Sequence, residues 1–195
     1  PDLQILFENG AKGQDVLGTE IFPEGSANYM NSSERDATYE EVLHFVHYYG
    51  IKNSFPAMQT AIDVAMSAAM SNGYYLPLSD IPEEDYDEEY LALLMEVYFG
   101  LWAHDPEENG FAGESEYSFI NRNEMLAGDS LGSNIIREFL GDHWRYIPEL
   151  PNSFSGHFSL SFDSTLGYTN RSQYLVNVLL SGENDVNITG NNYSN

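Results

Sequence analysis

The apolar stretch from Tyr90 to Trp102 restricts the fold more than any other part of this sequence. On a helical wheel its apolar side chains lie almost all round the axis instead of on one face, which is typical of a helix that is buried on every side. Such a helix needs other elements to cover it. The sequence therefore predicts a mainly helical body packed around residues 90–102.

Carboxylates accompany this apolar stretch. Glu89 and Glu96 are seven residues apart, and Asp85 lies on the same narrow stripe. A buried carboxylate needs a cation or hydrogen-bond donors. The chain has 31 Asp and Glu against 7 Lys and Arg, a formal charge of −24, so basic partners are scarce. Histidine or a metal ion is the expected partner of Glu89 and Glu96.

The charge balance, the lengths of the apolar stretches and the absence of Cys exclude several classes of protein. A polyanion with so few basic side chains cannot neutralise a phosphate backbone, so nucleic-acid binding is not expected. No stretch approaches the roughly 20 apolar residues of a membrane span. Disulfides are impossible because the chain has no Cys. The acidic surplus leaves three explanations open: a solvated surface, adaptation to high salt, or binding of a divalent cation such as Ca²⁺.

Further helices are predicted on both sides of the apolar stretch. Thr38 is expected to cap a helix that ends at Gly50, with Glu41 completing a capping box. A second helix is expected from about Pro56 to Asn72, where Gly73 stops it. The remaining predicted elements of the body are short strands at residues 3–7 and 15–22 and short helices near 118–127 and 130–140.

After Pro148 the hydrophobic pattern changes. Apolar residues alternate with Ser and His from Phe154 to Phe162, which predicts a half-buried strand. A second strand is predicted over residues 174–180, and a tail rich in Asn and Gly follows. We therefore expect an α+β fold, with a mainly helical domain over 1–150 and a β-rich extension over 151–195 that is a candidate start of a repeat array.

The first of these helices carries a candidate metal-binding group. At about 100° per residue, Glu40, His44 and His47 lie within about 60° of one another on the wheel. The i, i+4 spacing of Glu40 and His44 lets both side chains reach one cation. The ordinary alternative is the polar face of an amphipathic helix, and the alternative role of Glu41 is that of the capping acid.

Two segments resemble the zincin metallopeptidases. Residues 40–44, Glu-Glu-Val-Leu-His, resemble the H-E-x-x-H helix of that family. Residues 89–92, Glu-Tyr-Leu-Ala, resemble the E-F-F-A helix of the gluzincin branch related to the anthrax lethal factor catalytic domain. The resemblance covers residues 38–102 and implies a zincin-like scaffold with a Zn²⁺ site.

The resemblance also implies a role for each matching residue. Glu40 stands where the first His ligand belongs, His44 is the second ligand and Glu89 the third. Glu41 would be the catalytic general base, and Glu96 would orient a ligand from behind.

The replacement of the first His by Glu40 is a departure from the family pattern. A Glu/His/Glu set is harder and binds zinc less well than two His and one Glu. His47, one turn further along the same stripe, is the alternative ligand. The site is therefore either rearranged or has lost peptidase activity.

The end of the chain gives a second resemblance. Residues 174–182 and 187–191 resemble the segment that leads into the RTX calcium-binding repeats of secreted proteins, although no G-G-x-G-x-D unit occurs. This implies a secreted or cell-surface protein in a calcium-rich setting, and the start at Pro1 suggests an excerpt of a longer precursor. Four Asn-x-Ser/Thr sequons are glycosylation candidates: Asn31, Asn170, Asn187 and Asn192.

Two functions follow as hypotheses. The first is a secreted zincin-like metallopeptidase domain, active or degenerate, that acts on a peptide substrate. The alternative is a non-catalytic structural module of an extracellular or cell-surface assembly, in contact with neighbouring copies or domains. The acidic run Glu83–Glu89 adds calcium binding as a further reading, although it lacks the spacing of an EF-hand.

Overall fold

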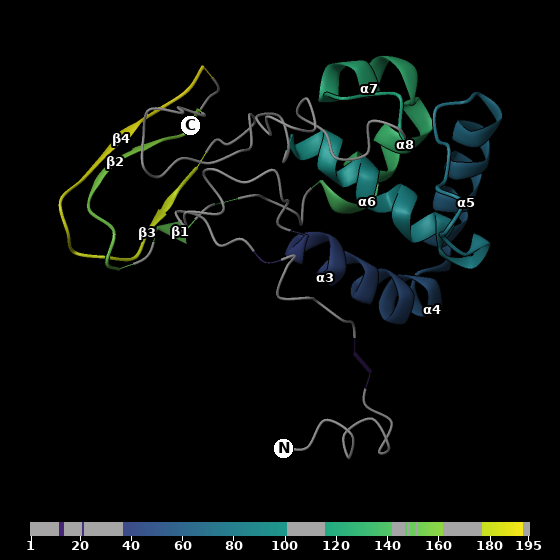
Figure 1. The fold of residues 1–195 in the computed structure, drawn as a ribbon, viewed down its shortest axis with the longest axis horizontal. Coiled ribbons are helices and arrows are strands. Elements are labelled where there is room, and N and C mark those ends of the chain that lie inside the picture. Colours follow the sequence, from purple (N-terminus) through teal and green to yellow (C-terminus); the bar gives the residue numbers. More distant parts are fainter. Residues whose placement is uncertain are drawn as a thin grey trace.

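The computed structural model has the α+β, mainly helical fold that the sequence predicts. Figure 1 shows the helices together on one side of the molecule and short strands on the other. The predicted strand at 3–7 lies outside the part of the chain that the structure describes, and so does 15–22 apart from Ile21. The structure describes residues 12–13, 21, 37–100, 116–141, 147, 149–150, 152–161 and 177–192.

Helix α6, Tyr86–Phe99, is the buried helix at the centre of the helical part. It follows a short 3₁₀ turn, Glu83–Asp85, and ends at Gly100, whose φ of 61° is the left-handed conformation that favours glycine. Every residue from Tyr90 to Val97 is buried. The prediction of a helix covered on all sides is therefore confirmed.

Helix α3, Thr38–Val46, lies against α6 and continues into a π-helical turn, His47–Ile51, and a short helix α4, Lys52–Ser54. Two predictions were wrong here. Thr38 is the first helical residue and not the cap, which is Ala37, so no capping box forms. The helical path also passes through Gly50, because burial of Ile51 in the core outweighs the low helix propensity of glycine.

Three more helices surround α6. Helix α5, Pro56–Ser71, matches its predicted span within one residue and packs on α6 and α8. Helix α7 is Arg122–Gly128, and α8 is Ser130–Ile135 followed by a π-helical turn, Ile136–Leu140. None of the helices described is long and apolar enough to cross a membrane.

A buried carboxylate ties α8 to α6. Asp129 caps α8 by accepting a hydrogen bond from the Gly132 backbone at 2.9 Å. Its other oxygen accepts from the hydroxyls of Tyr90 at 2.6 Å and Tyr117 at 2.8 Å. Burial raises the pKa of both tyrosines far above the ordinary value, and the negative charge of Asp129 raises it further. Both hydroxyls therefore stay protonated and donate hydrogen bonds to Asp129.

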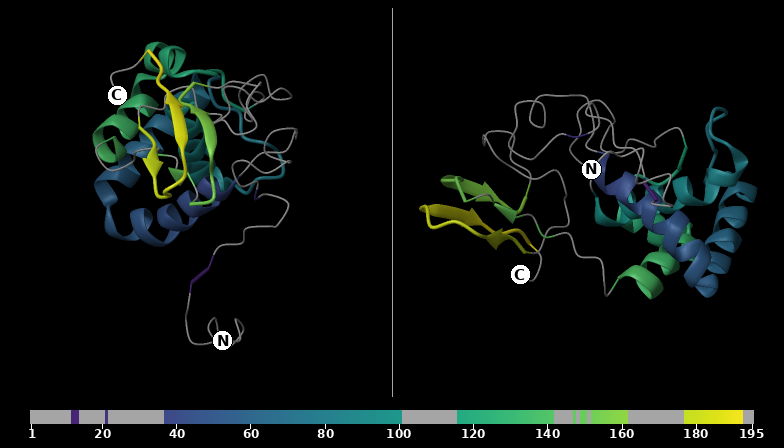
Figure 2. Two further views of the ribbon diagram at one scale, coloured as in Figure 1. Left: turned by 90° about the vertical axis from the view of Figure 1, so that its left-hand side faces the viewer. Right: turned by 90° about the horizontal axis from the view of Figure 1, so that it is seen from below.

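The strands form two parallel pairs. Strand β1, Glu149–Leu150, pairs with β3, Leu179–Leu180, and β2, Gly156–Ser159, pairs with β4, Val186–Thr189. Figure 2 shows β2 and β4 side by side in both views. The predicted C-terminal β segment is thus present, but β4 lies in the tail where no strand was predicted.

Candidate metal centre

Glu40, His44 and Glu89 meet at the contact between α3 and α6. Each offers one possible ligand atom, and these atoms all lie within 4.8 Å of one another. Glu40 and His44 are buried, at 5% and 6% exposure, whereas Glu89 is partly exposed. Consecutive helical turns place Glu40 and His44 together, and the first turn of α6 supplies Glu89. In the part of the chain that the structure describes, this is the group that could hold a metal ion.

The His44 ring gives a second observation in favour of a metal site. Its Nε2 atom is buried and has no hydrogen-bond partner among the described residues. It lies 3.9 Å from Oε1 of Glu89, too far for a hydrogen bond. On the other side of the ring, Nδ1 lies 3.9 Å from Oε2 of Glu41. A buried nitrogen without a partner is costly, and a cation between His44 and Glu89 would remove that cost.

The donor set fits a divalent metal ion. Two ligands about 2.1 Å from a tetrahedral zinc ion are separated by roughly 3.4 Å. The 3.9 Å between His44 and Glu89 needs to shorten by about half an ångström, which small side-chain rotations provide. One imidazole and two carboxylates also suit manganese and iron, and carboxylates alone favour calcium. The site could therefore hold a metal ion, but its donor set does not select one particular metal.

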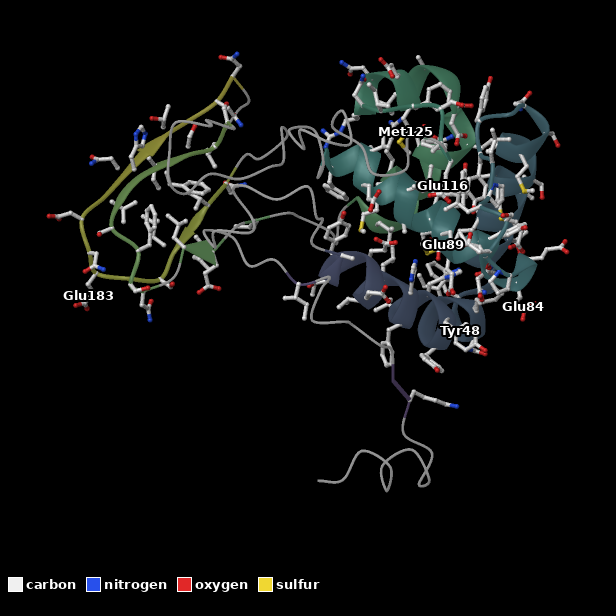
Figure 3. All side chains as sticks on the ribbon, in the orientation of Figure 1. Tyr48, Glu84, Glu89, Glu116, Met125 and Glu183 are labelled. Atoms are coloured by element: carbon white, nitrogen blue, oxygen red, sulfur yellow. The ribbon has the colours of Figure 1, made fainter. Side chains whose placement is uncertain are left out.

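The three residues open onto a cavity of about 420 Å³. Its polar lining is almost entirely acidic: seven carboxylates and one histidine face it, and no Lys or Arg is among its lining residues. Figure 3 marks two of these carboxylates, Glu89 and Glu116. The lining residues are Glu40, Glu41, His44, Leu78, Ile81, Asp85, Glu88, Glu89, Ala92, Leu93, Glu96 and Glu116.

A short backbone pairing brings Glu116 into this lining. Tyr75 and Tyr117 form an isolated antiparallel bridge. The carbonyl of Glu116 accepts from the Leu76 backbone at 2.7 Å, and the Ser118 backbone donates to Tyr74 at 2.9 Å. Sequence analysis missed Glu116, because no local pattern indicates which residue before α7 reaches the cavity.

The carboxylates in the lining repel one another. Burial raises the pKa of the Asp85 carboxyl above its ordinary value, and the charges of Glu88 and Glu84 raise it further. Lys52 lowers it, but by less than these effects combined. A bound cation would relieve the repulsion that these neighbours share.

Glu96, predicted to support a ligand, is 1% exposed and lies in the same lining. Its Oε1 accepts a hydrogen bond from the Tyr39 hydroxyl at 3.0 Å. This bond joins α6 to the residue that precedes Glu40. Glu96 therefore helps to fix α3 against α6, next to the candidate ligands.

His47 lies in a different cluster and is not brought to the three candidate ligands. Its Nε2 is 2.9 Å from Oε1 of Gln59, while the amide nitrogen of Gln59 donates to Asp63 at 2.8 Å and Asp87 at 2.7 Å. Because the Gln59 oxygen can only accept, Nε2 of His47 carries the proton. Lys52 completes the cluster through a 2.9 Å ion pair with Asp87.

The glycosylation candidates are placed only in part. Asn187 lies on β4 and is exposed, and Asn192 is near the end of the described chain. Asn31 and Asn170 lie outside the described residues.

Comparisons with known proteins give no match: no family model, no curated protein and no solved structure resembles the chain significantly.

Proposed function

We propose that the helical part of this chain is a zincin-like, metal-dependent hydrolase domain of a secreted or cell-surface protein. Zn²⁺ would be held by Glu40, His44 and Glu89, and peptides would be the substrate. The observation that carries the proposal is the convergence of these three side chains around a buried His44 nitrogen that has no hydrogen-bond partner among the described residues.

Glu41, Glu96 and Tyr39 have different roles in the proposed site. Glu41 lies beside the His44 ring and faces the same cavity, so it can take up a proton from an attacking water molecule. Glu96 and Tyr39 hold the two helices in register. When bound, the zinc ion would supply Lewis-acid polarisation of the substrate carbonyl.

The donor set also bears on how active the domain is. Two carboxylates neutralise a divalent ion, whereas two histidines and one carboxylate leave one positive charge on the site. Less positive charge stabilises a developing oxyanion less strongly. We therefore expect slower turnover than a His₂Glu site provides.

The metal is tested by element analysis of purified, dialysed protein. The proposal expects about one zinc ion per chain, lost in His44→Ala. His157→Ala is the matched control, since His157 is exposed on β2 and bonds to Thr189 at 2.6 Å. Protein that never retains or gains zinc, or that holds it equally in both variants, would overturn the assignment.

Catalysis is tested separately with Glu41→Gln. This variant should keep its zinc and lose peptide hydrolysis at least a hundredfold, because the base is removed and the ligands remain. If wild-type hydrolysis is measurable and Glu41→Gln retains it in full, Glu41 is not the base.

A second candidate function is the non-catalytic structural module of an extracellular assembly. The two parallel strand pairs favour it, since parallel pairing across a fixed distance in sequence is typical of repeat architectures. A stoichiometric metal ion without any hydrolysis of a broad peptide library would favour this candidate over the first.

A further inference from the structure

Both strand pairs have the same register. Glu149 aligns with Leu179 and Leu150 with Leu180, and the four residues of β2 align with the four of β4, so every partner is 30 residues away. We call the described residues within 149–160 (149–150 and 152–160) the first coil and residues 179–190 the second coil. Two pairs with one common offset indicate that the second coil is stacked on the first as a unit.

The turn between the strands is stacked as well. The Asn184 amide donates to the carbonyls of Asn152 at 3.1 Å and Phe154 at 3.2 Å. The Ser181 hydroxyl donates to the carbonyl of Leu150 at 2.8 Å. The second coil therefore contacts the first at both strand pairs and at the turn between them, through backbone and side chains.

Equivalent positions in the two coils differ in burial. Leu150 and Phe158, in the first coil, are 2% and 0% exposed. Their aligned residues in the second coil, Leu180 and Ile188, are 48% and 39% exposed. No third strand pairs with β3 or β4 in the part of the chain that the structure describes. The second coil thus presents a strand edge beside a row of apolar side chains.

We propose that the outer side of the second coil is a docking surface for a further polypeptide coil, parallel and in the same register, with apolar side chains over Leu180 and Ile188. The surface continues the interface that already exists between the two coils. An open strand edge is a template for an added strand, and backbone hydrogen bonds give such additions their affinity. This surface shares no residue with the metal centre.

The chemistry of the partner follows from the existing stack. In the existing stack, the carbonyls of Asn152 and Phe154 accept hydrogen bonds from the Asn184 side chain. The residues 30 positions further on, Gly182 and Asn184, offer the equivalent carbonyls on the outer side of the second coil. The partner coil therefore needs an Asn over Asn184. The turn of the partner coil should carry amide or positively charged side chains, because Glu183 and Asp185 make the surface acidic there. Residues 177–192 themselves meet the apolar and Asn requirements.

The test uses a synthetic peptide with the sequence of residues 177–192, carrying Glu183→Gln and Asp185→Asn so that its turn presents amides to the acidic turn of the second coil; the peptide is acetylated, amidated and added to the full chain. Saturable 1:1 binding is expected, together with slower hydrogen exchange of the β4 amides. Ile188→Asp in the full chain should weaken binding at least about tenfold by placing a charge in the apolar row. Ile147→Asp is the matched control, since Ile147 is exposed to a similar extent, 45% against 39% for Ile188, but precedes the first coil; this variant should bind normally.

Three results would overturn the proposal. The first is no saturable binding up to about 1 mM peptide, an affinity limit near 4 kcal/mol. The second is equal binding by Ile188→Asp, with its helical content checked by circular dichroism. The third is self-association of the chain without peptide that protects the same β4 amides, because the occupant would then be a second copy.

Discussion

Replacement of Asp129 by Ala is the sharpest test of how the helices are held together. The change removes the cap of α8, which costs about 1 kcal/mol. It also leaves the hydroxyls of Tyr90 and Tyr117 without their acceptor, at about 1–3 kcal/mol for each buried group. We expect a loss of about 5 kcal/mol in the free energy of unfolding, or a Tm lower by about 10–20 °C for a chain of this size.

The assay is urea unfolding followed by circular dichroism, with the metal removed so that binding does not contribute. Asp63→Ala is the matched control, because Asp63 is exposed on α5 and accepts one bond from Gln59. Its loss should stay within about 0.5 kcal/mol. Asp129→Asn keeps an acceptor for the Gly132 backbone and should fall between the two. A loss below about 1 kcal/mol for Asp129→Ala would refute the reasoning.

Three further outcomes are expected. Burial raises the pKa of Tyr75, Tyr90 and Tyr117 above the unfolded-state value of about 10. Their contribution to the free energy of unfolding is therefore complete below about pH 10 and is lost as the pH rises above it. Urea unfolding at pH 9, 10 and 11 should show this decline. Gly132→Ala should destabilise the protein by about 1–3 kcal/mol, because the added methyl would lie 2.5–2.6 Å from side chains of α6 and the α8 cap; thermal unfolding measures the change. A chelator should lower the Tm of the wild type but not that of His44→Ala, and equal shifts would contradict the site.

The parts of the site that are local in sequence could be predicted. The burial of α6 follows from apolar residues all round one helix, and the pairing of Glu40 with His44 follows from their i, i+4 spacing on α3. The approach of Glu89 depends on how α3 packs against α6, which no local pattern determines. The resemblance to a known helix pair supplied that step.

The position of His47 could not be predicted, for two physical reasons. A wheel drawn at 100° per residue assumes a regular α-helix, but a π-helical turn starts at His47 and has a different angular spacing. The partner that holds its ring, Gln59, belongs to another helix. Strand β4 was missed for a similar reason, because its pairing with β2 joins residues 30 positions apart.

The common offset of the two coils also has a genetic consequence. Duplication or deletion of 30 consecutive codons shifts every residue of a coil onto the position of its aligned partner, so each strand pair keeps its inward and outward faces. A change of one codon within either turn would instead put β2 and β4 out of step with β1 and β3. The β part of this protein can therefore change length in whole coils, whereas the helices around Glu89 have no repeating unit by which to grow.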